Sequence, residues 1–200
     1  MLRKIGSQFK KPSGFLGRII SSIMVKGNRP AIEILIKDLN IKQEEKILEI
    51  GYGPGIGVKL IAENFDSCQI VGIDFSELMF KRATKRNKQF IINGKVELLF
   101  GDFLETEIVP GDFDKIYCVN VVYFWDNLQK PFQKIKALLK PGGIFSFYMA
   151  KNDDLNKLKF TKEDIFNKYS IEQVLEALKL VGFSEIDHFF DKGYFVKVKK

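Results

Sequence analysis

An acidic residue followed by three alternating glycines is the pattern in this sequence with the clearest chemical meaning. Residues 47–57 read ILEIGYGPGIG, so that Glu49 is followed by Gly51, Gly53 and Gly55. Glycines let the backbone adopt positive φ angles and approach a ligand closely. The stretch therefore predicts a loop between a buried strand and the next helix that either binds a ligand or is a tight turn without one.

Two common phosphate-binding loops do not fit this stretch. A Walker loop ends in Gly-Lys-Ser/Thr, which serves phosphate and magnesium, whereas Gly57 is followed by Val58 and Lys59. The dinucleotide fingerprint GxGxxG needs a third glycine at a position where this sequence has Ile56 or Val58. Both phosphate-binding interpretations are therefore excluded.

Acidic residues also follow the next two predicted strands. Asp74 ends the segment IVGID, and Asp102 follows the segment LLFG. A carboxylate at the first of these positions can accept hydrogen bonds from both hydroxyls of a ribose. The alternative role for Asp74 is to cap the helix that follows it.

The glycine loop and four later segments occur in the order found in one enzyme family. The later segments are IVGIDFS, LLFGDF, FDKIYCVNVVYFW and LLKPGGIFSFY. Over about residues 30–150 the chain resembles the class I S-adenosylmethionine-dependent methyltransferases. Glu49 and Tyr52 stand where Asp and Cys or Ser are commoner in that family, and neither change is expected to prevent binding.

This resemblance implies S-adenosylmethionine as the cofactor and methyl transfer to a small-molecule acceptor as the reaction. The cofactor has an ammonium and a sulfonium, which suit the carboxylate of Glu49. In the resembled family the residue at Asp102 contacts the adenine amine, and the residue at Phe103 lies next to the base. The cofactor-binding residues implied are Glu49, Gly51, Tyr52, Gly53, Gly55, Asp74, Phe75, Gly101, Asp102, Phe103 and Asn120.

Candidates for the acceptor side follow the fourth predicted strand. Their aromatic faces can stabilise an onium ion, and the alternative is that these aromatic residues anchor the loop to the core. Methyl transfer is an in-line displacement, so a general base is needed only when the acceptor must lose a proton. His188 falls in a late strand, away from this site, and is expected to be structural. The candidates are Asn120, Tyr123, Phe124, Trp125 and Asp126.

Several specialised acceptors and metal chemistry are disfavoured. The segment NVVY, residues 120–123, lacks the two prolines typical of enzymes that methylate the amino groups of adenine or glutamine. Cys118 lacks the Pro-Cys context of pyrimidine-carbon methylation, and Cys68 and Cys118 are too few thiols for arsenic methylation. One histidine and no CxxC pair predict that the protein holds no metal.

Alternating strand and helix patterns predict the elements that must position these residues. Their regular alternation predicts a Rossmann-like, doubly wound α/β sheet of seven strands, mostly parallel with the last antiparallel, and extra N-terminal helices. Ligands of such sheets bind at the carboxyl ends of the strands. Strands are expected over 46–50, 68–73, 95–100, within 115–124, 144–149, 184–190 and 193–200. Helices are expected over 15–24, 30–40, 55–64, 76–89, 126–140 and 170–182, with 151–169 an excursion from the core.

The positive charge of the chain is concentrated at its N-terminus. The net charge is +7, and residues 1–29 contain seven Lys or Arg and no Asp or Glu. We therefore divide the chain into a basic amphipathic arm or lid, 1–29, and a methyltransferase domain, 30–200. The arm is interpreted first as a lid. A membrane surface (for a phospholipid amine acceptor), RNA and mitochondrial targeting are the alternatives.

The composition of the chain indicates its class and its expected location. No apolar run approaches the length needed to cross a bilayer, and both cysteines lie in apolar segments, as is typical of a reducing compartment. A cytoplasmic location is expected. A cofactor-binding protein without turnover is the competing hypothesis on function. The acceptor atom and the oligomeric state stay open.

Overall fold

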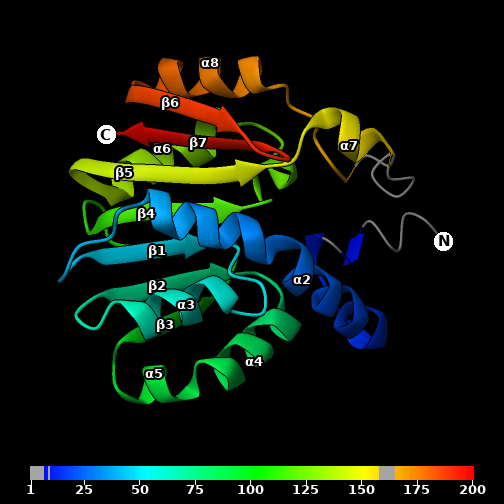
Figure 1. Cartoon of the computed structure of the whole chain (residues 1–200), viewed down its shortest axis with the longest axis vertical. Helices are drawn as coiled ribbons and strands as arrows, with labels where there is room; N and C mark the ends of the chain where they lie inside the picture. The colour runs from blue at the N-terminus through cyan, green and yellow to red at the C-terminus, as the bar shows by residue number, and fades with distance from the viewer. Residues whose placement is uncertain (1–6, 9, 158–164) are drawn as a thin grey trace.

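The computed structural model of the chain describes residues 7–8, 10–157 and 165–200. Its sheet contains seven strands, β1 to β7 in chain order, arranged as β3-β2-β1-β4-β5-β7-β6 (Figure 1). The first five strands run parallel, and β7 is antiparallel to both of its neighbours. This is the predicted Rossmann-like α/β sheet. The strands are β1 Lys46–Ile50, β2 Gln69–Asp74, β3 Val96–Phe100, β4 Phe113–Val119, β5 Leu139–Met149, β6 Ser184–Phe190 and β7 Tyr194–Lys199.

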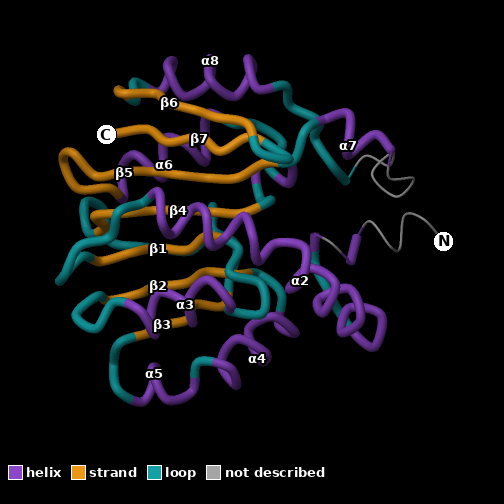
Figure 2. Tube along the Cα trace, in the orientation of Figure 1, coloured by secondary structure: helices purple, strands orange, loops and turns teal. Residues whose placement is uncertain are grey.

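Helices connect the strands and cover both faces of the sheet (Figure 2). Local hydrogen bonds and a glycine define three of the helix ends. Ser76 caps its helix by accepting from the Met79 amide, Ser170 and Gln173 form a capping box, and Gly182 ends the same helix with a φ of 85°. The described helices are α2 Gly14–Asp38, α3 Ile56–Asn64, α4 Glu77–Arg86, α5 Lys88–Ile92, the 3-10 turn η1 Val122–Phe124, α6 Gln129–Leu138, α7 Asn152–Lys157 and α8 Ile171–Val181.

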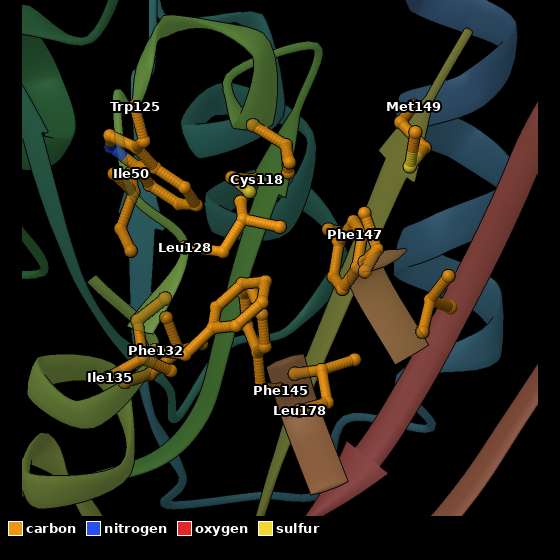
Figure 3. Packing of buried hydrophobic residues seen from close by; sticks show 14 of the residues in the cluster. Ile50, Cys118, Trp125, Leu128, Phe132, Ile135, Phe145, Phe147, Met149 and Leu178 are labelled. Atoms are coloured by element: carbon orange, nitrogen blue, oxygen red, sulfur yellow. The ribbon is translucent and has the colours of Figure 1, made fainter. Parts of the chain in front are cut away.

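The alternation of side chains along each strand divides the core into two layers. On β1, Ile47 packs in the layer under α2, α3 and α4, whereas Leu48 and Ile50 pack in the layer under α6 and α8. Figure 3 shows the second layer, in which Phe132 of α6 lies against Phe145 and Phe147 of β5. Odd-numbered residues of β1 therefore face α3, which places Glu49 on that side.

One helix replaces the two predicted at the N-terminus. α2 runs from Gly14 to Asp38 and contains Pro30 in its interior. Proline lacks the amide hydrogen that would bond the Lys26 carbonyl, and it usually kinks a helix. Pro30 is exposed, so that carbonyl stays within reach of water and the helix continues. The predicted boundary at residue 30 falls inside this helix.

Three further segments differ from the prediction. The helix expected over 76–89 divides at Asn87, whose buried Nδ2 donates to the carbonyls of Ala83 and Gly55. The fifth strand begins at Leu139, inside the helix expected over 126–140 and ahead of the strand expected over 144–149. Within 151–169, α7 and the buried Phe166 belong to the core layer under α6 and α8, so this segment is not wholly an excursion. Residues 158–164 lie outside the described residues.

The strand order reverses at β1. The chain moves outward from β1 through β2 to β3, and then returns to β4 on the other side of β1. In Figure 1 the arrowheads of these parallel strands point toward the edge of the sheet where the first half of α2 lies. A crevice outside the carboxyl ends of the strands, at such a reversal, is where ligands of this sheet type bind.

Candidate functional site

A cavity of about 430 Å³ opens at the carboxyl ends of the central strands. Its volume falls within the range of about 300–1,000 Å³ that is common for small-molecule sites. The structure brings together all of the predicted cofactor-binding residues except Gly55, which does not line the cavity. The lining includes Glu49, Gly51, Tyr52, Gly53, Asp74, Phe75, Gly101, Asp102, Phe103 and Asn120.

The three alternating glycines have left-handed backbones and different surroundings. Their φ angles are 71°, 52° and 75° for Gly51, Gly53 and Gly55. A Cβ at Gly51 would lie 2.6 Å from Val121 Cγ2, whereas one at Gly53 would meet no atom within 4 Å. A Cβ at Gly55 would lie 2.8 Å from the Cβ of Ala83 on α4. Gly53 therefore leaves backbone open toward the cavity, and Gly55 allows close packing of the loop on α4.

Glu49 and Tyr117 form a buried polar pair beneath the start of α3. They are register partners on β1 and β4, so their side chains lie on the same face of the sheet. A Cβ on Gly57 would come within 2.7 Å of Glu49 Oε1 and 2.5 Å of the Tyr117 hydroxyl. Glu49 Oε2 and the Tyr117 hydroxyl have no hydrogen-bond partner within the part of the chain that the structure describes.

Burial governs the protonation of Glu49. The residue is only 3% exposed, and loss of solvation raises the pKa of its carboxyl to about 8, although the nearby Tyr117 hydroxyl and Val58 amide act in the opposite direction. Burial of the Tyr52 side chain, together with the charges of Asp74 and Glu49, raises the pKa of the Tyr52 hydroxyl. That hydroxyl donates a hydrogen bond to the Leu99 carbonyl at 3.1 Å. A cation placed beside Glu49 would favour its ionised form.

Asp74 joins the glycine loop to the end of β2. Its Oδ2 accepts from the Gly53 amide and its Oδ1 from the Ser76 amide, both at 2.8 Å. Burial raises the pKa of this carboxyl to about 6, and these two amides act in the opposite direction. The residue therefore takes part in the predicted helix cap while it also lines the cavity.

Residues after β3 form another wall of the cavity. Asp102 is exposed, and its Oδ1 accepts from the Leu104 amide at 2.8 Å. Phe103 is buried, with Trp125 at 6.4 Å between ring centroids and the Lys134 ammonium 5.2 Å from its ring. The wall thus combines one solvated carboxylate with an apolar surface.

Asn120 adopts a strained backbone at the point where β4 ends. Its φ of 58° is uncommon for a residue with a side chain. Its Nδ2 donates to Asn28 Oδ1 on α2 at 3.0 Å, and its Oδ1 accepts from the Tyr123 hydroxyl at 2.5 Å. Tyr123 also accepts from the Ala150 amide and does not line the cavity. The Tyr123 hydroxyl therefore fixes the Asn120 side chain through a hydrogen bond on the side away from the cavity.

The other predicted acceptor-side residues reach the cavity. Phe124, Trp125 and Asp126 all line it. The Trp125 carbonyl accepts from Asn167 Nδ2 at 3.0 Å and from the Tyr169 hydroxyl at 2.8 Å. Trp125 also packs in the core layer under α6 and α8, so one side chain both lines the cavity and anchors the loop to the core.

The N-terminal segment was expected to act as a lid, but sequence reasoning did not identify which of its residues reach the site. Helical spacing indicated that α2 buries one stripe, and it could not show which side chains line the cavity. No sequence pattern marked Asn28 as a site residue, because its hydrogen-bond partner Asn120 is remote in sequence. His188 lies on the edge strand β6 and does not line the cavity. The cavity residues from this segment are Lys10, Pro12, Met24, Val25, Asn28 and Ile32.

Two kinds of feature are absent from the described residues. Across 7–8, 10–157 and 165–200, no group of three or more His, Cys, Asp or Glu is placed to hold a metal ion. No helix within those ranges is both long enough and apolar enough to span a bilayer.

Known proteins share both the sequence pattern and the fold. A family description for a methyltransferase domain matches residues 47–143. The uncharacterized methyltransferase YdaC of Bacillus subtilis is 31% identical over 170 residues, which cover 84% of this chain and 88% of that protein. The sterol 24-C-methyltransferase of Candida albicans is 28% identical over 165 residues. That match covers 77% of this chain, and the chain spans only 43% of the sterol enzyme.

A solved structure supports the fold. It is that of phosphoethanolamine N-methyltransferase 2 of Haemonchus contortus in complex with S-adenosyl-L-methionine. It superposes with a TM-score of 0.69 at 24% identity, over 80% of this chain and 38% of that chain. With the glycine loop, the strand order and the extent of the match to the Bacillus protein, the chain belongs to the class I S-adenosylmethionine-dependent methyltransferases.

Proposed function

We propose that this protein transfers a methyl group from S-adenosylmethionine to a small-molecule acceptor. The observation that carries the proposal is Glu49 Oε2, a buried oxygen without a partner among the described residues, in a side chain that lines the cavity. A buried polar atom without a hydrogen bond is costly. The ammonium of the cofactor would supply both the missing donor and the missing charge.

The other residues of the site fit the remaining parts of the cofactor. When bound, S-adenosylmethionine supplies an electrophilic methyl group on a sulfonium. Gly53 offers main chain without a Cβ to the amino acid moiety, and Asp74 has lone pairs for the ribose hydroxyls beyond those that bind two amides. Asp102 and Phe103 provide an acceptor and an apolar surface for the base.

Apolar side chains support an acceptor compartment that excludes water. Met24 and Val25 of α2 and Phe124 and Trp125 after β4 line the same cavity. Holding two reactants in line in such a compartment can contribute about 7–11 kcal/mol to the lowering of a barrier. A methyl transfer to an acceptor that is already deprotonated, such as a neutral amine, a thiolate or a carboxylate, needs no general base beyond this positioning.

Two printed names and the lining of the cavity bear on the class of acceptor. One relative is named for a sterol, and one structural neighbour is named for phosphoethanolamine, a polar amine. The sterol name and the apolar lining support an acceptor of lipid type, whereas the phosphoethanolamine name supports an amine as the accepting group. Methylation of RNA and cofactor binding without turnover are the competing functions.

The experiment follows label from methyl-radiolabelled S-adenosylmethionine into an extract separated into lipid, RNA and small-molecule fractions. Label in the lipid or small-molecule fraction is the expected result. Label confined to RNA would contradict the acceptor class. Cofactor binding without any transfer would favour the binding protein.

Replacing Asp74 is expected to weaken cofactor binding. Asp74→Ala removes the acceptor of two backbone amides and the proposed partner of the ribose, so affinity for S-adenosylhomocysteine should fall at least about tenfold. Isothermal titration measures this change, and thermal melting shows whether the variant remains folded. Asp66→Ala, at an exposed position, is the matched control. An affinity unchanged by Asp74→Ala would remove the ribose assignment.

A further inference from the structure

α2 presents two different apolar faces. One face packs on the domain, where Ile20, Ile32 and Leu35 are 4%, 6% and 0% exposed. The opposite face points to solvent, although four of its side chains are large and apolar. These are Phe15 at 78% exposed, Leu16 at 41%, Ile19 at 45% and Ile23 at 58%.

The four exposed side chains form one continuous stripe. Phe15, Ile19 and Ile23 recur every four residues, and Leu16 lies next to them on the helix surface. Single exposed apolar residues are ordinary, whereas a contiguous apolar patch indicates a binding surface. The first half of α2 lies at the margin of the molecule in Figure 1.

The charge around the stripe is positive. Lys26 lies on the same exposed side, and Arg18 borders it. The first acidic residue of α2 is Glu33, which already pairs with Arg29 at 2.8 Å. Arg82 of α4 adds a further guanidinium beside α2, because it donates to the Arg18 carbonyl at 3.0 Å. An apolar stripe bordered by cations has the composition of a helix that lies in an anionic lipid interface.

We propose that the outer face of α2, formed by Phe15, Leu16, Ile19 and Ile23, docks onto an anionic lipid bilayer. The apolar side chains enter the interface, and the neighbouring Lys and Arg contact lipid phosphates. RNA fits the observations less well, because its phosphates pair with the cations and leave the apolar stripe without a partner.

Docking would place the site close to the lipid surface. Met24, Val25 and Asn28 of the same helix line the cavity, so the helix that binds the bilayer also forms a wall of the site. The docking proposal goes beyond the proposed function and does not rest on it, because vesicle binding requires neither cofactor nor turnover.

The test is sedimentation of the full chain with two kinds of vesicle. One kind contains phosphatidylcholine with about a third phosphatidylglycerol, and the other contains phosphatidylcholine alone. We expect the wild type to bind the anionic vesicles at least about tenfold more tightly, and added salt to weaken that binding. The triple variant Phe15→Ser/Ile19→Ser/Ile23→Ser should lose at least tenfold in affinity for them.

A matched triple variant removes comparable apolar surface elsewhere. Ile92→Ser/Val109→Ser/Leu180→Ser changes three side chains that are 65%, 67% and 67% exposed and lie away from α2. It should bind anionic vesicles like the wild type. Isothermal titration with S-adenosylhomocysteine should give the same affinity for the wild type and both variants, which shows that the site is intact.

Three results would overturn the docking proposal. The first is a wild type that does not bind anionic vesicles. The second is equal vesicle binding by the α2 variant and the wild type. The third is binding to single-stranded RNA, but not to vesicles, that the α2 variant retains.

Discussion

At the scale of single residues, Glu49 shows how a strand pattern places a carboxyl in a buried environment that raises its pKa. Its place on β1 directs the carboxyl away from Leu48 and Ile50 and toward the start of α3. Gly57 leaves room for that carboxyl, because a side chain there would overlap it. Burial then disfavours the charge, and the cationic cofactor that we propose would restore it.

The raised pKa of Glu49 predicts how stability depends on pH. The carboxyl has an ordinary pKa of 4.5 and a folded-state pKa of about 8. Between these values the folded state binds more protons than the unfolded state, so the free energy of unfolding falls as pH rises. From pH 6 to pH 8 the decrease should reach up to about 1.4 kcal/mol per pH unit. Urea titrations of the cofactor-free wild type and of Glu49→Gln measure it.

The variant Glu49→Gln should lose most of that slope, because a glutamine does not titrate. The window starts at pH 6 because Asp74, whose pKa is about 6, contributes mainly below it. Parallel slopes for wild type and variant would show that the Glu49 carboxyl is not held protonated by burial.

A methyl group at residue 57 is predicted to be destabilising. In Gly57→Ala the new Cβ would lie 2.5 Å from the Tyr117 hydroxyl and 2.7 Å from Glu49 Oε1. Overpacking of this kind costs about 1–3 kcal/mol, and it should also weaken S-adenosylhomocysteine binding. The matched control is Gly27→Ala in α2, where a Cβ meets nothing within 4 Å. The control should gain about 0.5–1 kcal/mol of stability in the same urea titration. Equal effects of the two substitutions would contradict the packing argument.

At the scale of elements, the site depends on how α2 is fixed to the loop after β4. The Asn28–Asn120 hydrogen bond joins the two at the cavity, and Tyr123 holds Asn120 from the other side. Two of these residues are far apart in sequence, at positions 28 and 120. The bond lets an N-terminal helix shape a pocket whose other walls come from the sheet.

Removing that bond is predicted to loosen the site more than the fold. Asn28→Ala leaves the strained Asn120 with one side-chain partner fewer, which should cost about 1 kcal/mol of stability. Affinity for S-adenosylhomocysteine should fall by about three- to tenfold in isothermal titration. Lys26→Ala, on the outer face of the same helix, should leave that affinity unchanged. The account of α2 would be wrong if the two variants bound the cofactor product equally well.

Local patterns explain how much of these elements could be predicted from the sequence. The strands, the helix over 170–182 and the glycine loop depend on residues a few positions apart, and each was predicted. The division of a helix at Asn87 was not, because it depends on a bond to Gly55. The sequence predicted two helices where the structure has the single helix α2. Its continuity depends on Pro30 lying on the exposed side of the helix, which the sequence pattern did not show. The pairing of Glu49 with Tyr117 follows from strand order, which no local pattern contains.

At the scale of the whole molecule, the reversal of strand order at β1 assembles the site. It brings the ends of β1, β2, β3 and β4 to one edge of the sheet, and α2 adds a wall to the cavity there. Residues as far apart in the sequence as Lys10 and Lys130 therefore line the same cavity. The sequence predicted the sheet, most residues at its edge and an N-terminal lid, whereas the residues of α2 that form the wall required the structure.

The most direct test of this account is a crystal structure of the full chain with S-adenosylhomocysteine. We predict that the ligand's amino group lies beside Glu49, its ribose hydroxyls at Asp74 and its adenine against Phe103. Density for the ligand outside this cavity, or a cavity filled by protein side chains in its presence, would contradict the account.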